Sequence, residues 1–246
     1  MIPEALAPAM RFCLIQTAPL YGIISPMNTT SARPGLGRYL LIALAGLAAV
    51  VGGALSASYL LGPAAPQEPP GLQATYLPGG KPLRPFTLVD HRGERFDNSR
   101  LHGHWTFLFF GYTHCPDACP SALAVLNAVA EGLKERAPGL PLQVVMVSVD
   151  PARDTPERLA AYVPYFNQAF LGATGDDEAL TPLTRDLGII YVRHEPDPDS
   201  NAYLVDHSTA ILLINPKGEL QAIFGQPHIP QPIVDDVLKI QEHHQS

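Results

Sequence analysis

The sequence predicts an α/β domain with a mixed central sheet and helices on both faces, preceded by one N-terminal transmembrane helix. Continuous apolar runs such as "WTFLFFGY" and "LQVVMVSVD" are typical of strands that are buried on both faces. Helical periodicities alternate with these runs, as in α/β domains. Ahead of the domain, "YLLIALAGLAAVVGGALSASYLL" carries no charge over residues 39–61, which is enough to cross a bilayer as a helix.

We interpret residues 39–61 as a retained membrane anchor. Arg33 and Arg38 precede it, and no Lys or Arg follows until Lys81. The positive-inside rule therefore predicts a cytoplasmic N-terminus and an extracytoplasmic remainder, as in a bacterial inner-membrane protein with a periplasmic domain. Cleavage near "ALSAS" is the alternative, although the apolar run is longer than the core of a typical signal peptide.

Residues 1–38 are the predicted cytoplasmic tail. Met27 begins a short basic leader directly before the apolar run, so residues 1–26 are either an over-extended gene start or part of this tail. Cys13 lies in the tail. It is then separated by the membrane from the two other cysteines, which form an isolated pair.

Residues 62–85 are rich in Pro and Gly and predict a semi-extended tether between the anchor and the domain. The domain is expected over residues 86–246. The chain carries a formal net charge of −7 and its Lys and Arg residues are scattered. A nucleic-acid partner is therefore not expected, because such proteins present a clustered basic surface.

Within the domain, each element has its own signal. The expected elements are a hairpin around Arg92 and Gly93, strands at 105–112, 142–150, 189–194, 208–216 and 217–225, and helices at 121–136, 154–166, 176–188 and 230–244. Apolar residues at helical spacing mark the first helix. Asp154 is the expected N-cap of the second, with Pro156 in its first turn, and Gly188 is expected to end the third.

Cys115 and Cys119 follow the strand at 105–112, at the sheet edge where open α/β folds place their sites. Residues four apart on a helical turn lie about 5–6 Å apart, so the two thiols can form a disulfide or bind one ion. Amides at a helix N-terminus would favour the thiolate. A static disulfide is the least favoured role, because so small a loop gains little stability; redox exchange and metal binding remain open.

A third ligand would distinguish these roles, and the chain has nine histidines. His207 lies at the start of the strand expected at 208–216. If that strand neighbours the strand at 105–112, His207 can approach the cysteines; an exposed histidine at a strand end is equally compatible with the pattern. His114 adjoins Cys115, and on an extended chain end its side chain should point the other way.

Three motifs, "GYTHCPDACP", "VSVDPARDTPERL" and "DHSTAILLINPKGE", follow one another behind the membrane segment. Together they resemble the Sco/SenC family, membrane-anchored copper proteins of cytochrome c oxidase assembly. The resemblance implies a thioredoxin-like fold with an inserted hairpin in "HEPDPDSNAYLVDHS". It also implies that Cys115, Cys119 and His207 bind copper, as Cu(I) or Cu(II). Asp117 and Asp206 match positions linked to metal handling or partner docking. Their carboxylates would orient His207 or attract a basic patch on a partner, and solvated caps are the alternative.

The implied function is a copper chaperone that supplies the dinuclear copper site of cytochrome c oxidase subunit II, with a copper donor chaperone and a thiol reductant as further partners. The chemistry agrees, since thiolates suit Cu(I) and imidazole suits both oxidation states. The alternative is a thiol:disulfide oxidoreductase that reduces the cysteines of that site. A peroxidase is less favoured, because Tyr112 stands where a T-x-x-C pattern requires Thr. Asp150 is expected to be structural.

Overall fold

The computed structural model describes residues 35–60, 69, 71–198, 200 and 202–245. Two compact units result, Met1–Pro63 and Ala64–Ser246, and each is described by itself. In the first, helix α1 (Leu36–Leu60) contains a segment, Gly37–Ala57, that is long and apolar enough to cross a membrane. The tail over residues 1–34, with Cys13, and the start of the predicted tether lie outside the described residues.

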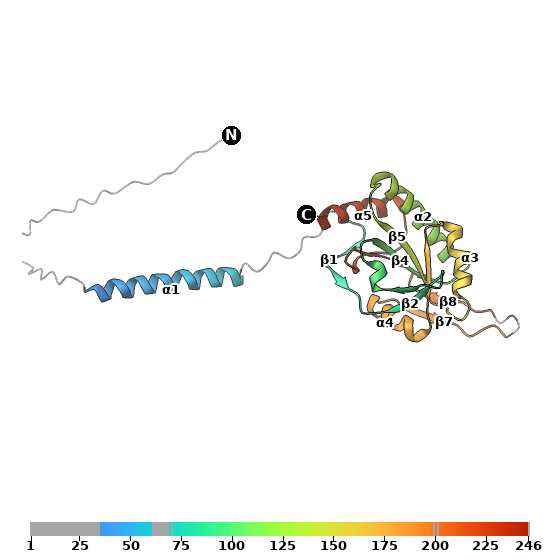
Figure 1. Ribbon diagram of the computed structural model, residues 1–246, viewed down its shortest axis with the longest axis horizontal. Coiled ribbons are helices and arrows are strands. Elements are labelled where there is room, and N and C mark those ends of the chain that lie inside the picture. The colour runs from blue at the N-terminus through green and yellow to red at the C-terminus, as the bar shows by residue number, and fades with distance from the viewer. Residues whose placement is uncertain (1–34, 61–68, 70, 199, 201, 246) are drawn as a thin grey trace, which may run out of the picture. The chain divides into compact units, whose positions relative to one another are not determined.

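The second unit is built on an eight-stranded mixed sheet (Figure 1). Its strands are β1 (Thr75–Pro82), β2 (Thr87–Asp90), β3 (Arg95–Asp97), β4 (Trp105–Gly111), β5 (Leu142–Ser148), β6 (Leu171–Thr174), β9 (Ile211–Ile214) and β10 (Glu219–Phe224). Their order in space is β1-β10-β9-β4-β5-β6-β2-β3. Strands β4, β5 and β6 run parallel, whereas β9 is antiparallel to β4 and to β10. The predicted mixed sheet is confirmed, and the condition set for the approach of His207, that β9 neighbours β4, is met.

Helices cover both faces of this sheet. They are α2 (Ala118–Arg136), α3 (Pro156–Phe166), α4 (Asp177–Leu187) and α5 (Pro230–Gln245). The crossovers through α2 and α3 move the same way across the sheet, so the right-handed crossover rule puts both helices on one face. Helix α4 leads back toward β9 and lies on the other face (Figure 1). Helix α2 packs against α5 and α3.

Strand β4 is the centre of the hydrophobic core. All seven of its residues are buried, as the continuous apolar run predicts for a strand with helices on both sides. Its aromatic residues Phe107, Phe109 and Phe110 are fully buried. This packing fixes the end of β4, and therefore the position of the cysteine segment that follows it.

The predicted tether is wrong at its C-terminal end. Residues 75–82 form β1, in which Tyr76 pairs with Ala222 and Lys81 with Leu220 of β10. The register shifts between these pairs, where Gly79 and Gly80 adopt φ values of 82° and 72°. Such a bulge requires glycine, because other residues rarely adopt positive φ. The glycines therefore belong to an edge strand, and the domain begins before residue 86.

The predicted cap of α3 is also wrong by one residue. Thr155 is the N-cap, and its hydroxyl accepts a hydrogen bond from the amide of Arg158 at 3.3 Å. Asp154 is fully buried and binds a different segment. The left-handed Gly188 that ends α4 agrees with the sequence signal, and Asp176 is the N-cap of this helix.

A separate hairpin carries the candidate histidine. Strands β7 (Tyr191–Arg193) and β8 (Val205–His207) pair only with each other, with Tyr191 opposite His207. This is the insertion that the resemblance implies. His207 was predicted to start the strand beside β4, which is β9. The prediction is wrong, because His207 is the last residue of the preceding strand, β8. Val192 and Asp206 are exposed on one face of the hairpin, whereas Tyr191 and His207 are partly buried on the other.

Candidate metal centre

The structure brings the three predicted ligands together. The sulfur atoms of Cys115 and Cys119 and a ring nitrogen of His207 all lie within 4.8 Å of one another. Nε2 of His207 is 3.4 Å from Sγ of Cys119. Both cysteines are free thiols, so the group offers two sulfurs and one imidazole nitrogen to a single ion.

The two cysteines differ in their surroundings. Cys115 lies in the turn after β4 and is partly exposed, whereas Cys119 lies in the first turn of α2 and is fully buried. The amide of Cys119 approaches Sγ of Cys115 at 3.4 Å. Helix α2 begins at Ala118, so Pro120 occupies its first turn, where no intrahelical amide bond is lost.

Burial raises the pKa of the Cys119 thiol, and the neighbouring Cys115 adds to this effect, while a backbone hydrogen bond at Tyr112 opposes it. The net direction for Cys119 in the metal-free protein is therefore opposite to the one that amides of a helix N-terminus would give. Desolvation is the largest cause, because this sulfur lies inside the core. Metal binding at this sulfur must displace a proton.

Gly111, the last residue of β4, allows Cys119 to pack so closely. A Cβ atom on this glycine would lie 2.8 Å from Sγ of Cys119 and 2.8 Å from the ring of Phe109. Neither neighbour is a flexible surface group. A side chain at this position would therefore displace the sulfur or the aromatic ring.

We expect Gly111→Ala to lower the free energy of unfolding by about 1–3 kcal/mol, the usual cost of overpacking a core. Urea denaturation measures it. Gly139→Ala is the matched control, because a Cβ atom at Gly139 would meet nothing within 4 Å. An equal, small change in both variants would contradict the close approach to Cys119.

The ring of His207 is oriented by the backbone. Nδ1 of His207 lies 3.0 Å from the carbonyl oxygen of Ser208. Because a carbonyl oxygen can only accept a hydrogen bond, Nδ1 carries the proton. The lone pair of Nε2 then faces Cys119. The rings of Phe109 and Tyr112 meet the imidazole edge to face, with centroids at 6.1 Å and 5.8 Å. These contacts hold the imidazole in the form that binds metal.

The side chains of Asp206 and Asp117 take no part in orienting the ring of His207. Oδ2 of Asp206 is 2.8 Å from Nε2 of His194, on the exposed face of the hairpin. The hypothesis that Asp206 orients His207 is therefore wrong. Asp117 precedes α2, is exposed, and accepts a weak hydrogen bond from Ser121 at 3.4 Å. Partner docking by these two carboxylates stays a prediction.

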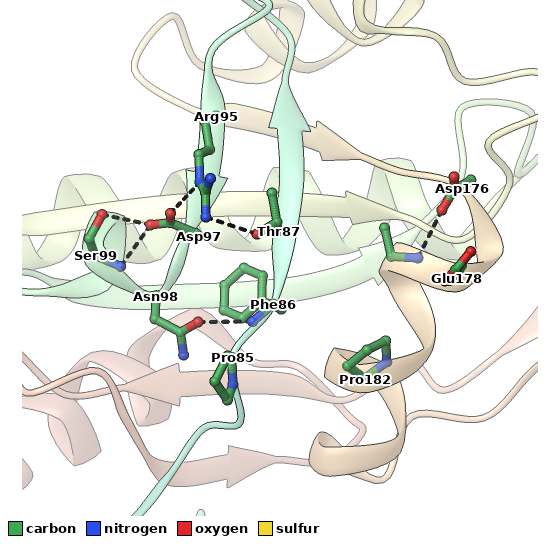
Figure 2. Close-up of a pocket in the computed structure, with 11 residues that line it drawn as sticks. Pro85, Phe86, Thr87, Arg95, Asp97, Asn98, Ser99, Asp176, Glu178 and Pro182 are labelled. Carbon is green, nitrogen blue, oxygen red and sulfur yellow. Dashed lines mark hydrogen bonds and ion pairs between the residues drawn. The ribbon is translucent and has the colours of Figure 1, made fainter.

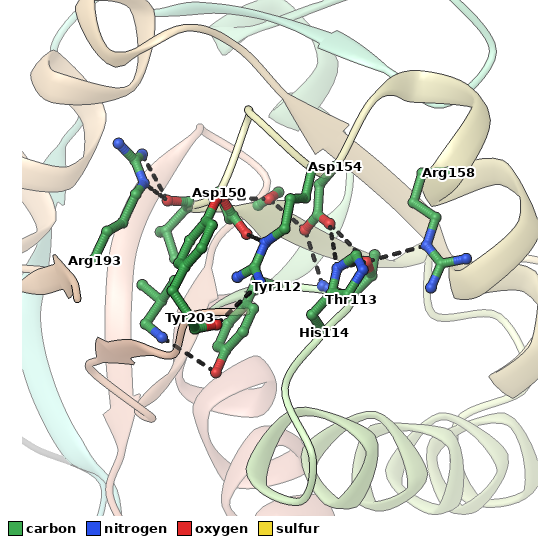
Figure 3. A network of polar contacts seen from close by, with 12 residues as sticks. Tyr112, Thr113, His114, Asp150, Asp154, Arg158, Arg193 and Tyr203 are labelled. Carbon is green, nitrogen blue, oxygen red and sulfur yellow. Dashed lines mark hydrogen bonds and ion pairs between the residues drawn. The ribbon is translucent and has the colours of Figure 1, made fainter. Parts of the chain in front are cut away.

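His114, Asp150 and Asp154 form a second group of possible ligands (Figure 3). Oδ2 of Asp154 accepts from the amide of Thr113 at 2.9 Å and from the hydroxyl of Ser148 at 2.7 Å, and Oδ1 accepts from the Thr113 hydroxyl at 2.6 Å. Asp150 likewise accepts hydrogen bonds from the hydroxyl of Tyr203 and from Nε of Arg153. Every oxygen of the two carboxylates already accepts from a protein donor, so we assign no ion here. The structural role predicted for Asp150 agrees with these contacts.

A hollow of about 520 Å³ lies between the β2–β3 hairpin and α4 (Figure 2). Its polar groups bind one another: Nε of Arg95 is 2.6 Å from Asp97, and Asn98 accepts from the amide of Phe86 at 3.0 Å. None of the three predicted ligands lines it. These groups hold the hairpin, and we assign them no ligand.

The comparisons with known proteins agree with this site. The SCO1/SenC family profile matches residues 77–242. The chain belongs to the SCO1/SenC family. The resemblance noted from the three motifs is therefore confirmed, and the match begins inside β1, in agreement with the corrected start of the domain.

Curated relatives are similar over the same region. The chain is 38% identical over 155 residues to the mitochondrial protein SCO2 homolog of Mus musculus, which covers 63% of this chain and 60% of that protein. It is 37% identical over 155 residues to the mitochondrial protein SCO1 homolog 1 of Arabidopsis thaliana, covering 63% and 46%. The chain thus spans about half to three fifths of these relatives.

Solved structures share the thioredoxin-like Sco fold. Arabidopsis thaliana ScoI with copper bound is 36% identical, with a TM-score of 0.61, over 66% of this chain and 98% of that one. Yeast Sco1 with copper bound is 30% identical, with a TM-score of 0.61, over 68% and 90%. The predicted fold class is confirmed.

The sequence analysis missed the residues that hold the hairpin against the domain. These are Tyr112, Arg153, Arg193 and Tyr203. Arg153 lies inside the quoted motif "VSVDPARDTPERL", Tyr112 inside "GYTHCPDACP" and Tyr203 inside "HEPDPDSNAYLVDHS". The motifs were therefore the available signal, but no spacing shows that these residues contact one another.

Proposed function

We propose that this protein binds one copper ion through Cys115, Cys119 and His207 and delivers it to the dinuclear copper site of cytochrome c oxidase subunit II. The observation that carries the proposal is the convergence of two free thiols and one imidazole nitrogen within 4.8 Å. Soft sulfur ligands suit Cu(I), and imidazole is acceptable to Cu(I) and Cu(II). Two structural relatives with this fold were solved with copper bound, and the Sco family is described as one of cytochrome c oxidase assembly proteins.

Three protein ligands favour transfer over storage. They leave coordination positions open, so a thiolate of the receiving protein can enter before the first ligand leaves. Cys115 and His207 are partly exposed, whereas Cys119 is buried, so exchange should begin on the side of Cys115 and His207. Both thiols must be reduced to bind copper, so a thiol reductant is required where the compartment oxidises cysteines, and a copper donor chaperone would load the site.

Membrane anchoring supports delivery to a membrane enzyme. Helix α1 would hold the protein in the inner membrane, with Arg38 and Arg33 on the cytoplasmic side and the metal centre in the periplasm. Confinement of both partners to one membrane raises their effective concentration without a large interface. The exposed carboxylates of Asp117 and Asp206 would then attract a basic patch on a partner.

A thiol:disulfide oxidoreductase is the second candidate, favoured by the pairing of one partly exposed thiol with one buried thiol. The Cys115 thiolate would attack a disulfide of the target and release one target thiolate. Cys119 would then attack the mixed disulfide, releasing the second thiol and leaving a Cys115–Cys119 disulfide. A thiol reductant would restore the pair.

His207→Ala separates the two functions. We expect Cu(I) affinity of the reduced full-length protein to fall by more than about a hundredfold, since even outer-shell partners of a metal ligand contribute 10–100-fold. Disulfide exchange by the cysteine pair should persist. Competition with a chromophoric Cu(I) chelator measures the first, and reduction of a model disulfide measures the second.

His194→Ala is the matched control, because His194 lies on the exposed face of the same hairpin. It should leave copper affinity within about twofold, as expected for a surface substitution. Unchanged copper affinity in His207→Ala would reject the three-ligand site. If His207→Ala lost disulfide exchange but retained copper affinity, the oxidoreductase would become the favoured function and copper delivery the second candidate.

A further inference from the structure

His207 is carried by an element that has little stability of its own. Strands β7 and β8 have three residues each and form a separate two-stranded sheet. An isolated hairpin of this kind is at best marginally stable in water. Contacts outside the hairpin must therefore keep His207 beside the cysteines.

Those contacts begin at Tyr203, two residues before β8. Its hydroxyl donates to Oδ1 of Asp150 at 2.6 Å, in the loop that follows β5 (Figure 3). The guanidinium of Arg153 lies 3.5 Å from the centroid of the Tyr203 ring, and its Nη1 donates to the Tyr203 carbonyl at 3.0 Å. Arg153 also donates to Asp150 through Nε. The three residues thus form a closed set of contacts.

The burial of this set makes each contact costly to lose. The Asp150 side chain is fully buried, and a buried carboxylate without its donors is strongly unfavourable. The Arg153 side chain is 19% exposed, and its guanidinium also lies 5.6 Å from the centroid of the Tyr112 ring. Cation–π contacts and charge-assisted hydrogen bonds strengthen when water is excluded.

The same loop also holds the cysteine segment. Asp154 binds both the amide and the hydroxyl of Thr113, two residues before Cys115. On the hairpin side, Nε and Nη2 of Arg193 donate to the Val149 carbonyl at 2.9 Å and 2.7 Å. The loop after β5 is therefore the common support for ligands that lie far apart in the sequence.

We propose that Asp150, Arg153 and Tyr203 are positioning residues, a hairpin clamp that holds His207 in reach of copper before the ion arrives. The inference rests on the ligand set proposed above. A clamped hairpin keeps nearly all molecules competent to bind with three ligands. Loosening the clamp lowers this competent fraction, and the apparent affinity falls in proportion.

Tyr203→Phe tests the clamp with little change in shape, because it keeps the ring over Arg153 and removes the hydroxyl bond to Asp150. We expect Cu(I) affinity of the full-length protein to fall about threefold to tenfold. In the metal-free protein, the amide of Val205 should exchange its hydrogen faster while amides of β4 keep their rates. Tyr165→Phe is the matched control, since Tyr165 is 85% exposed on α3, and it should change neither quantity.

A double-mutant cycle with His207→Ala shows whether the clamp acts through the imidazole. Tyr203→Phe should lower copper affinity in the native background and have no further effect once His207 is absent. An equal loss in both backgrounds, or faster exchange throughout β4, would overturn the clamp. If Tyr203→Phe kept normal Cu(I) affinity and normal amide hydrogen exchange while His207→Ala lost Cu(I) affinity as expected, the clamp would be rejected and the ligand set retained. No loss in His207→Ala would reject the ligand set itself.

Discussion

Cys119→Ser is expected to lower the Cu(I) affinity of the reduced protein by about 70-fold to 900-fold. The estimate divides the ~10–16 kcal/mol of a four-ligand zinc site among its ligands, which assigns roughly 2.5–4 kcal/mol to each. Serine is nearly isosteric, but its oxygen is a hard, un-ionised ligand that suits Cu(I) poorly. The loss should be large because Cys119 is buried and its sulfur lies 3.4 Å from His207.

Cys13→Ser is the matched control, as the same substitution in the N-terminal tail. It should leave Cu(I) affinity unchanged if the tail lies across the membrane from the metal centre. Chelator competition under anaerobic, reducing conditions measures both variants, and urea denaturation of Cys119→Ser checks that the domain is folded. Copper affinity that survives in Cys119→Ser but falls in Cys13→Ser would reject the proposed centre.

Asp154→Ala is expected to lower the free energy of unfolding by about 3–5 kcal/mol. Asp154 accepts three hydrogen bonds, two from Thr113 and one from Ser148, and its side chain is fully buried. Its removal leaves buried donors without an acceptor, and each costs roughly 1–3 kcal/mol. The segment that precedes Cys115 loses its attachment to the loop after β5.

Urea denaturation measures this loss, with Asp176→Ala as the comparison. Asp176 is exposed and caps α4 through one hydrogen bond to the amide of Ala179 at 2.8 Å. Removing such a cap costs about 1 kcal/mol. Equal losses in the two variants would show that the buried network around Asp154 contributes no more than a surface cap.

Much of the fold follows from local sequence signals. Strand β4 was expected from an apolar run that only a strand covered on both faces can accommodate. Gly188 marks the end of α4 because its left-handed conformation is open to glycine. Where local signals failed, long-range pairing was the cause: Gly79 and Gly80 resemble a linker, but β10 pairs with the segment that contains them.

The candidate site shows the same division. The two cysteines were identified from their place at the end of β4. The assignment of His207 depended on resemblance to a family, because the pattern around it equally fits an exposed strand end. Orientation of His207 was one of the roles considered for Asp206, yet the alternation of side chains along β8 directs neighbours to opposite faces, and Asp206 binds His194 instead.

The sequence by itself determined the apolar N-terminal helix, most of the strands and helices of the domain, the chemical types of the donors and the family, because these depend on composition, periodicity and motifs within short windows. Only the tertiary structure decided that Cys119 is buried deeply enough to raise the pKa of its thiol. It also decided that Asp154 holds Thr113 rather than capping α3, and that Tyr203 meets Asp150. These properties depend on which surfaces meet when distant segments pack, and no local pattern records that.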